Sequence, residues 1–149
     1  MRTPAIVLLL LVGCDSKEPE KKPPAAHVHT APHGGTLVDL EGAHLELVFD
    51  LATGKMTGYI LDAEAEKSVR IEQKVIRLVA ITRLQTIVVD LDAVGNPLTG
   101  EKPGDTSQFE GRSTPLKAFA EFECQVKEIT VKGKLLGAAP FPFPKGNEK

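Results

Sequence analysis

Residues 44–50 (HLELVFD) and 56–62 (MTGYILD), joined through residues 52–55 (ATGK), decide the fold of this chain. In the first segment apolar side chains occupy every second position, which is the pattern of a half-buried β-strand. These alternating apolar residues are Leu45, Leu47 and Phe49. The connection carries Gly54 where a tight turn needs a positive φ. Together the two segments predict an antiparallel β-hairpin.

Short runs rich in Val, Ile and Leu continue the same pattern along the chain. They cover residues 68–71, 75–81, 86–91, 119–126 and 129–131. Residues 135–143 form a last candidate strand, which its prolines restrict to a sheet edge or an extended tail. No segment sustains an apolar stripe at helical spacing. The prediction is therefore an all-β protein, an antiparallel β-sandwich or open barrel of about seven or eight short strands.

The start of the chain resembles the signal sequence of bacterial lipoproteins. Arg2 precedes an apolar run at residues 5–12 (AIVLLLLV), which is too short for a bilayer core that needs roughly 20 helical residues. The run ends in Leu11-Val12-Gly13-Cys14, which resembles a lipobox. The resemblance implies cleavage before Cys14 and a diacylglycerol on its thiol. An ordinary signal peptide that contains a cysteine is the alternative.

This resemblance implies a lipid-anchored protein that faces the periplasm or another extracytoplasmic space. Asp15 resembles the signal that keeps lipoproteins of enteric bacteria in the inner membrane, so we expect that membrane rather than the outer one. The following residues are rich in Lys, Glu and Pro, which predicts a disordered tether. The expected organisation is a signal peptide, a lipidated tether, a β domain and a Pro-rich tail, at residues 1–13, 14–32, 33–140 and 141–149.

The charge balance argues against a nucleic-acid-binding protein, and the cysteine content argues against a domain held together by disulfides. Lys and Arg number 18 against 20 Asp and Glu, a near-balance that argues against nucleic-acid binding. With Cys14 lipidated, Cys124 is the remaining cysteine and no intramolecular disulfide can form. Cys124 shares its alternation with Phe122 and Val126, which predicts a buried structural thiol.

The histidines have the character of metal ligands. His27, His29 and His33 lie close together, and His44 follows at the start of the hairpin. Neutral imidazoles bind Cu(II) and Zn(II), so these four residues are the candidate ligands of a copper or zinc site. In the alternative, His27 and His29 are solvated tether residues, His33 caps the first strand, and His44 lies on a solvent face.

Several short elements in residues 30–65 resemble segments of known bacterial proteins. They are His33-Gly34-Gly35, Glu46-Leu47-Val48, Thr53-Gly54 and Tyr59-Ile60-Leu61-Asp62. They are similar to small bacterial lipoproteins and to the N-terminal segments of periplasmic adaptors of heavy-metal efflux systems. The resemblance implies metal handling, with a metal-efflux component or another envelope protein as partner. The helical hairpin of a full adaptor is absent from the sequence pattern, so the chain would be a stand-alone relative of one small module.

A second candidate site lies in residues 90–101 (DLDAVGNPLTGE), which nearly match a calcium-binding loop. Val94 occupies one ligand position, however, and Pro97 stiffens the loop. The alternative is a long loop at residues 95–111 that contacts a partner protein. Phe109 would then either anchor that contact or fix the loop to the core.

The pattern offers no catalytic constellation. Ser107 and Ser113 lack the glycines of a nucleophile elbow. Glu46 and Asp50 alternate along their strand, which favours a solvated face over acid–base catalysis. We therefore expect a non-enzymatic binding module at the membrane, which handles a transition metal through its histidines. The alternative is a structural or assembly lipoprotein that binds another envelope protein through residues 95–111 and needs no metal.

Overall fold

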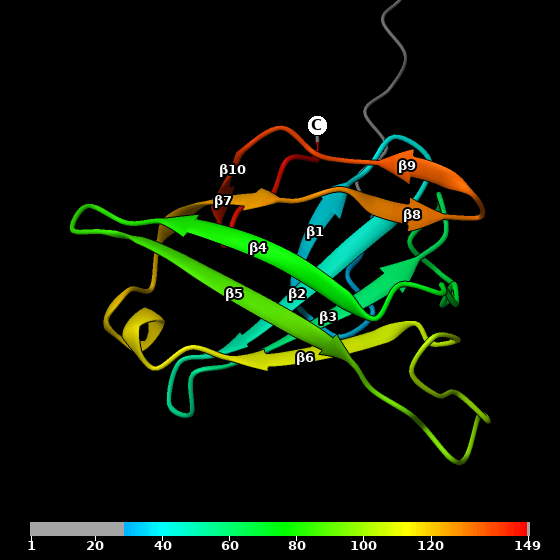
Figure 1. Ribbon diagram of the computed structural model, residues 1–149. Coiled ribbons are helices and arrows are strands. Elements are labelled where there is room, and N and C mark those ends of the chain that lie inside the picture. Colours follow the sequence, from blue (N-terminus) through cyan, green and yellow to red (C-terminus); the bar gives the residue numbers. More distant parts are fainter. Residues whose placement is uncertain (1–28, 149) are drawn as a thin grey trace, which may run out of the picture.

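The computed structural model describes residues 29–148, and strands dominate this part of the chain (Figure 1). The strands of the main sheet are β1 (Thr36–Asp39), β2 (His44–Asp50), β3 (Lys55–Leu61), β4 (Val75–Ile81), β5 (Thr86–Ala93), β6 (Gln108–Arg112), β7 (Phe122–Val126) and β10 (Phe141–Phe143). These eight antiparallel strands follow the order β1-β2-β3-β6-β5-β4-β7-β10 and curl until the sheet nearly closes into a barrel. The all-β prediction is confirmed, in its open-barrel form.

Smaller elements complete the described part. β8 (Ile129–Val131) and β9 (Lys134–Leu136) form a separate two-stranded ribbon, and a single 3₁₀ turn covers Pro115–Ala118. Within residues 29–148 no helix is long and apolar enough to cross a membrane. Cys14, His27, the signal peptide and most of the expected tether lie outside the described residues.

The predicted hairpin is present as β2 and β3, with His44 opposite Leu61 and Asp50 opposite Lys55. Gly54 has a φ of 72° and donates its N–H to the carbonyl of Asp50 at 2.7 Å. The Asp50 carboxylate also accepts the Thr53 hydroxyl at 2.6 Å, which lowers the pKa of Asp50 below its ordinary value. The turn is thus held by the residue at its start and by the glycine that permits its backbone angle.

Alternation along the strands builds the core. In β5 every second side chain is buried, and the same pattern recurs in β4 and β7. The largest fully buried side chains include Phe109, Phe141, Leu45, Leu47, Met56, Ile60, Ile76, Leu78 and Leu91. Cys124 is buried among them, and burial raises the pKa of its thiol to about 12. The predicted structural thiol is confirmed.

Residues 108–112 differ from the expected long loop, because they form β6 between β3 and β5. Phe109 lies on β6 and is fully buried, so it packs in the core and is not exposed to a partner. Gly111 lets β6 approach β5 closely, since a Cβ there would collide with the carbonyl oxygen of Asp90. Because a glycine replaces an apolar side chain in this short strand, the sequence does not show the alternating pattern by which a strand is recognised.

The sheet also continues beyond residue 140, where the β domain was expected to end. Phe141 and Phe143 are buried, and β10 pairs with β7 at the sheet edge that its prolines predicted. Residues 144–148, which we call the strap, then cross the seam between β10 and β1. The Thr36 hydroxyl donates to the carbonyl of Pro144 at 2.9 Å. The strap therefore bridges the two edges of the open barrel.

Candidate metal site

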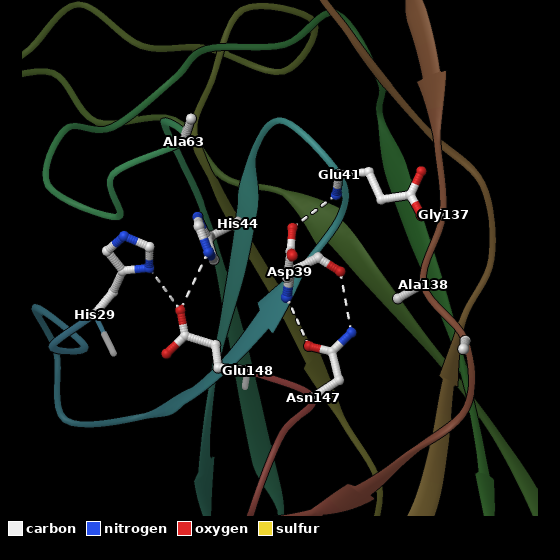
Figure 2. A pocket seen from close by; sticks show the side chains of 10 residues that line it. His29, Asp39, Glu41, His44, Ala63, Gly137, Ala138, Asn147 and Glu148 are labelled. Carbon is white, nitrogen blue, oxygen red and sulfur yellow. Dashed lines mark hydrogen bonds and ion pairs between the residues drawn. The ribbon is translucent and has the colours of Figure 1, made fainter. Parts of the chain in front are cut away.

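Two histidines and a glutamate converge beside the seam. His29 lies before β1, His44 is the first residue of β2, and Glu148 lies on the strap. One nitrogen or oxygen of each side chain lies within 4.8 Å of the others. Figure 2 shows the two imidazoles approaching the Glu148 carboxylate from different segments of the chain. Three separate parts of the sequence thus meet at one point.

The distances suit a shared cation. Oε1 of Glu148 accepts a hydrogen bond from Nδ1 of His29 at 2.8 Å and lies 3.2 Å from Nε2 of His44. Two donors of a tetrahedral Zn(II) ion lie roughly 3.3 Å apart when each bond is about 2.05 Å long. The ring centroids of His29 and His44 are 4.9 Å apart and the rings are steeply inclined, so their edges can face one ion. The three side chains together could hold one ion as a two-imidazole, one-carboxylate set.

The hydrogen bond behind His44 fixes which of its nitrogens can bind. Nδ1 of His44 lies 3.0 Å from the carbonyl oxygen of Asp62, and a carbonyl only accepts, so Nδ1 carries the proton. In a neutral imidazole Nε2 then holds a lone pair, which points at the negative oxygen of Glu148. Two acceptors facing each other repel, and a positive charge between them, from a metal ion or a proton, makes the arrangement favourable. A carbonyl partner behind a histidine is also the usual support of a metal ligand.

Burial of the three side chains makes a positive charge between them more favourable. The side chains of His44, Glu148 and His29 are 5%, 15% and 21% exposed. They line a pocket of about 470 Å³ together with Asp39, Glu41 and Asn147, and no Lys or Arg is among its lining residues. Reduced solvation strengthens the interaction of a cation with the Glu148 carboxylate, whereas Asp39 and Glu41 are exposed and add negative charge at the rim. The pocket therefore favours a cation over an anion.

The structure divides the predicted histidine cluster. His29 and His44 lie together, and His44 is buried rather than on a solvent face. His33 lies apart from them, with its ring stacked on Tyr59 at a centroid distance of 3.7 Å. Its Nδ1 is 2.7 Å from Oε2 of Glu46. His33 thus has its own partner and is not in the group that could share an ion with His29 and His44.

Glu46 corrects another expectation, since it is fully buried and does not belong to a solvated face. Its Oε1 accepts the backbone N–H groups of His33 and Gly35, both at 2.8 Å. The turn before β1 folds over the outer side of β2 and supplies these donors. A buried carboxylate with three donors is satisfied in place, so Glu46 fixes this turn.

The calcium-loop candidate is not supported by the geometry. Asp90 pairs with Arg77 through two contacts of 2.7 and 2.8 Å, which lowers the pKa of Asp90 below its ordinary value. Glu101 accepts the hydroxyls of Ser107 and Thr99, both at 2.6 Å. Both carboxylates already have hydrogen-bond partners, and they lie on different elements of the fold. Among residues 29–148, the metal-ligand group is the one formed by His29, His44 and Glu148.

Glu148 is the candidate ligand that the sequence pattern missed. It follows a Pro-rich segment and precedes Lys149, and no histidine or cysteine stands near it in the sequence. Only the path of the strap across the seam brings it to His29 and His44. Comparison with family models, with curated proteins and with solved structures gave no match. The role of this site must therefore be inferred from its chemistry.

Proposed function

We propose that this chain is a non-enzymatic, lipid-anchored binding module that takes a divalent transition-metal ion, Zn(II) or Cu(II), on His29, His44 and Glu148. The observation that carries the proposal is the contact between Nε2 of His44 and Oε1 of Glu148. The proton on Nδ1 leaves both of these atoms as acceptors when the imidazole is neutral. A metal ion satisfies both at once.

The donor set supports a borderline metal. Imidazole nitrogen suits Zn(II) and Cu(II), whereas Ca(II) and Mg(II) prefer oxygen ligands alone. Two imidazoles and one carboxylate leave a coordination position for water or another ligand, as in zinc sites with three protein ligands. Such a site exchanges its ion more readily than a closed four-ligand site. This suits capture or delivery of an ion at the envelope.

The proposed location follows from the lipobox resemblance at Cys14. The chain from Cys14 to His29 spans at most about 50 Å even when fully extended, at about 3.5 Å per residue. The metal site would therefore work close to the membrane surface. A metal-efflux component in the same membrane is the partner that this position and the resemblance in residues 30–65 suggest.

The test is a competition titration of the purified full chain in detergent, with Zn(II) or Cu(II) and a chelator of known affinity. His29→Asn keeps a polar group near the position of Nδ1 and weakens the ligand, and Glu148→Gln removes the charge. We expect both variants to lose affinity by at least about tenfold, since even support residues of metal sites contribute about 10- to 100-fold. His33→Asn and Glu121→Gln are the matched controls and should bind as the unchanged chain does. Equal binding by all variants would end the proposal.

A partner-binding role of the loop before β6 is the second candidate function. Its support is Leu98, whose side chain is 96% exposed in the turn between Asn96 and Gly100. Cross-linking in intact cells with Leu98→Ser tests it, with Leu135→Ser as the control at another exposed leucine. Loss of one stoichiometric partner in the Leu98 variant alone would support this role, and an unchanged pattern would exclude it.

A further inference from the structure

We infer that a bound metal ion locks the strap across the seam between β1 and β10 and fixes His29 to the barrel at the same time. The inference rests on the proposed metal site and adds how that site is regulated. Glu148 belongs to the strap, whereas His44 belongs to β2 on the other side of the seam. An ion that joins them ties the strap to the barrel.

Apart from Glu148, three hydrogen bonds hold the strap to β1, one of which is the part-buried bond from Thr36 to Pro144. Asn147 makes two of them, since its Oδ1 accepts the N–H of Asp39 at 2.7 Å and its Nδ2 donates to the Asp39 carbonyl at 3.1 Å. Figure 2 shows this side-chain amide pairing with the edge of β1 as a neighbouring strand would. Both contacts are exposed to solvent. Polar contacts of this kind compete with water and open readily.

The glycine of the strap explains how it reaches this position. Gly146 has a φ of 78°, and its N–H donates to the carbonyl of Pro142 at 2.9 Å, which closes a turn after β10. A Cβ at Gly146 would collide with the carbonyl oxygen of Leu37. The turn aims Asn147 and Glu148 at β1 and at the two histidines. The turn at Gly146 therefore favours the closed position of the strap, and a bound ion would stabilise that position further.

Opening and metal binding are linked. When the strap leaves β1, Glu148 moves away from the ion and only the two imidazoles remain, so the open form binds metal more weakly. Metal therefore shifts the strap toward its closed form. By thermodynamic reciprocity, closure of the strap raises the metal affinity by the same factor. The ion thus controls how long the outer edge of β1 stays covered.

Amide hydrogen exchange of the full chain in detergent micelles, followed by NMR with and without Zn(II), tests this linkage. The Asp39 and Gly146 amides are the reporters, since Asp39 donates to Asn147 on the strap and Gly146, on the strap, donates to Pro142 on β10. At a zinc concentration of about 100 times Kd, their exchange should slow by at least about tenfold, with an upper limit of about 100-fold if the open form binds no metal. Amides in the centre of β4 and β5 should change much less. In Glu148→Gln, zinc should leave the reporters unchanged.

Asn147→Ala tests the reciprocal effect without altering a metal ligand. It should speed exchange at Gly146 and raise the apparent Kd for zinc in proportion to the closed form that is lost, whereas Asn96→Ala, the same change in a distant turn, should do neither. Failure of the unchanged chain to bind zinc would overturn the proposed function itself. Binding that depends on Glu148 but leaves Gly146 exchange unaltered would overturn the lock alone and leave the metal site standing.

Discussion

Replacement of Glu148 by Gln should change metal affinity and metal-free stability in opposite directions. Oε1 of Glu148 faces Nδ1 of His29 at 2.8 Å and Nε2 of His44 at 3.2 Å. In the variant an amide nitrogen can occupy this position and donate an N–H to the lone pair on Nε2 of His44. The repulsion at His44 is then replaced by a hydrogen bond, in addition to the one that His29 already makes with residue 148. The metal, in contrast, loses an anionic ligand.

The magnitudes separate the two effects clearly. Support residues around a metal contribute about 10- to 100-fold in affinity, so loss of a direct ligand should cost ~100-fold, or about 2.7 kcal/mol. The metal-free variant should gain about 1 kcal/mol from the improved hydrogen bonding, which corresponds to a rise in Tm of about 4 °C for a domain of this size.

Thermal unfolding in excess chelator measures the stability, and chelator competition measures the affinity. Glu121→Gln, at an exposed site outside the group formed by His29, His44 and Glu148, controls for the change in net charge. A Glu148→Gln variant with lower metal-free stability and unaltered zinc affinity would refute the reasoning. That outcome would identify Glu148 as the partner of a charged imidazole and not as a metal ligand.

Other predictions concern the fold. Because burial raises the pKa of Cys124 to about 12, a thiol reagent at neutral pH should label it slowly in the folded protein and rapidly in urea. Leu91→Ala removes a fully buried side chain at the centre of the barrel and should cost about 2–5 kcal/mol in urea unfolding, whereas Leu98→Ala should stay within about 0.5 kcal/mol. The backbone N–H groups of Glu66 and Lys67 lower the pKa of Asp62, so its contribution to stability is present above about pH 4 and is lost as the pH falls through the lowered value. Asp62→Asn should therefore make unfolding less sensitive to acid, measured as the urea midpoint between pH 5 and 2.

The sequence pattern predicted the elements whose burial follows a regular period. The hairpin at β2 and β3 and the long strands β4 and β5 are examples, because their alternating side chains point by turns into the core and to solvent. β6 escaped the pattern because Gly111 replaces a side chain where the strand passes close to β5. Residues 68–71 form only isolated bridges, at Ser68 and Ile71, although their composition favours a strand.

Two of the three residues of the candidate site were predicted. His29 and His44 were recognised by residue type, since imidazole is an intrinsic metal ligand. Glu148 was missed because a carboxylate becomes a ligand only through its surroundings, and its surroundings come from the strap. Glu46 was misjudged for a related reason: a period-two pattern cannot show that a turn folds over the outer face of a strand. In both cases long-range topology decided the role of an acidic residue.

Pulsed EPR of the Cu(II)-loaded full chain tests the central claim, that His29 and His44 share an ion with Glu148, most directly. The number of coordinated imidazoles can be counted from the modulation by their remote nitrogens. We predict one fewer imidazole in His29→Asn than in the unchanged chain, one fewer in His44→Asn, and an unaltered number in His33→Asn. A spectrum that is insensitive to His29 and His44, or that loses an imidazole with His33, would contradict the account.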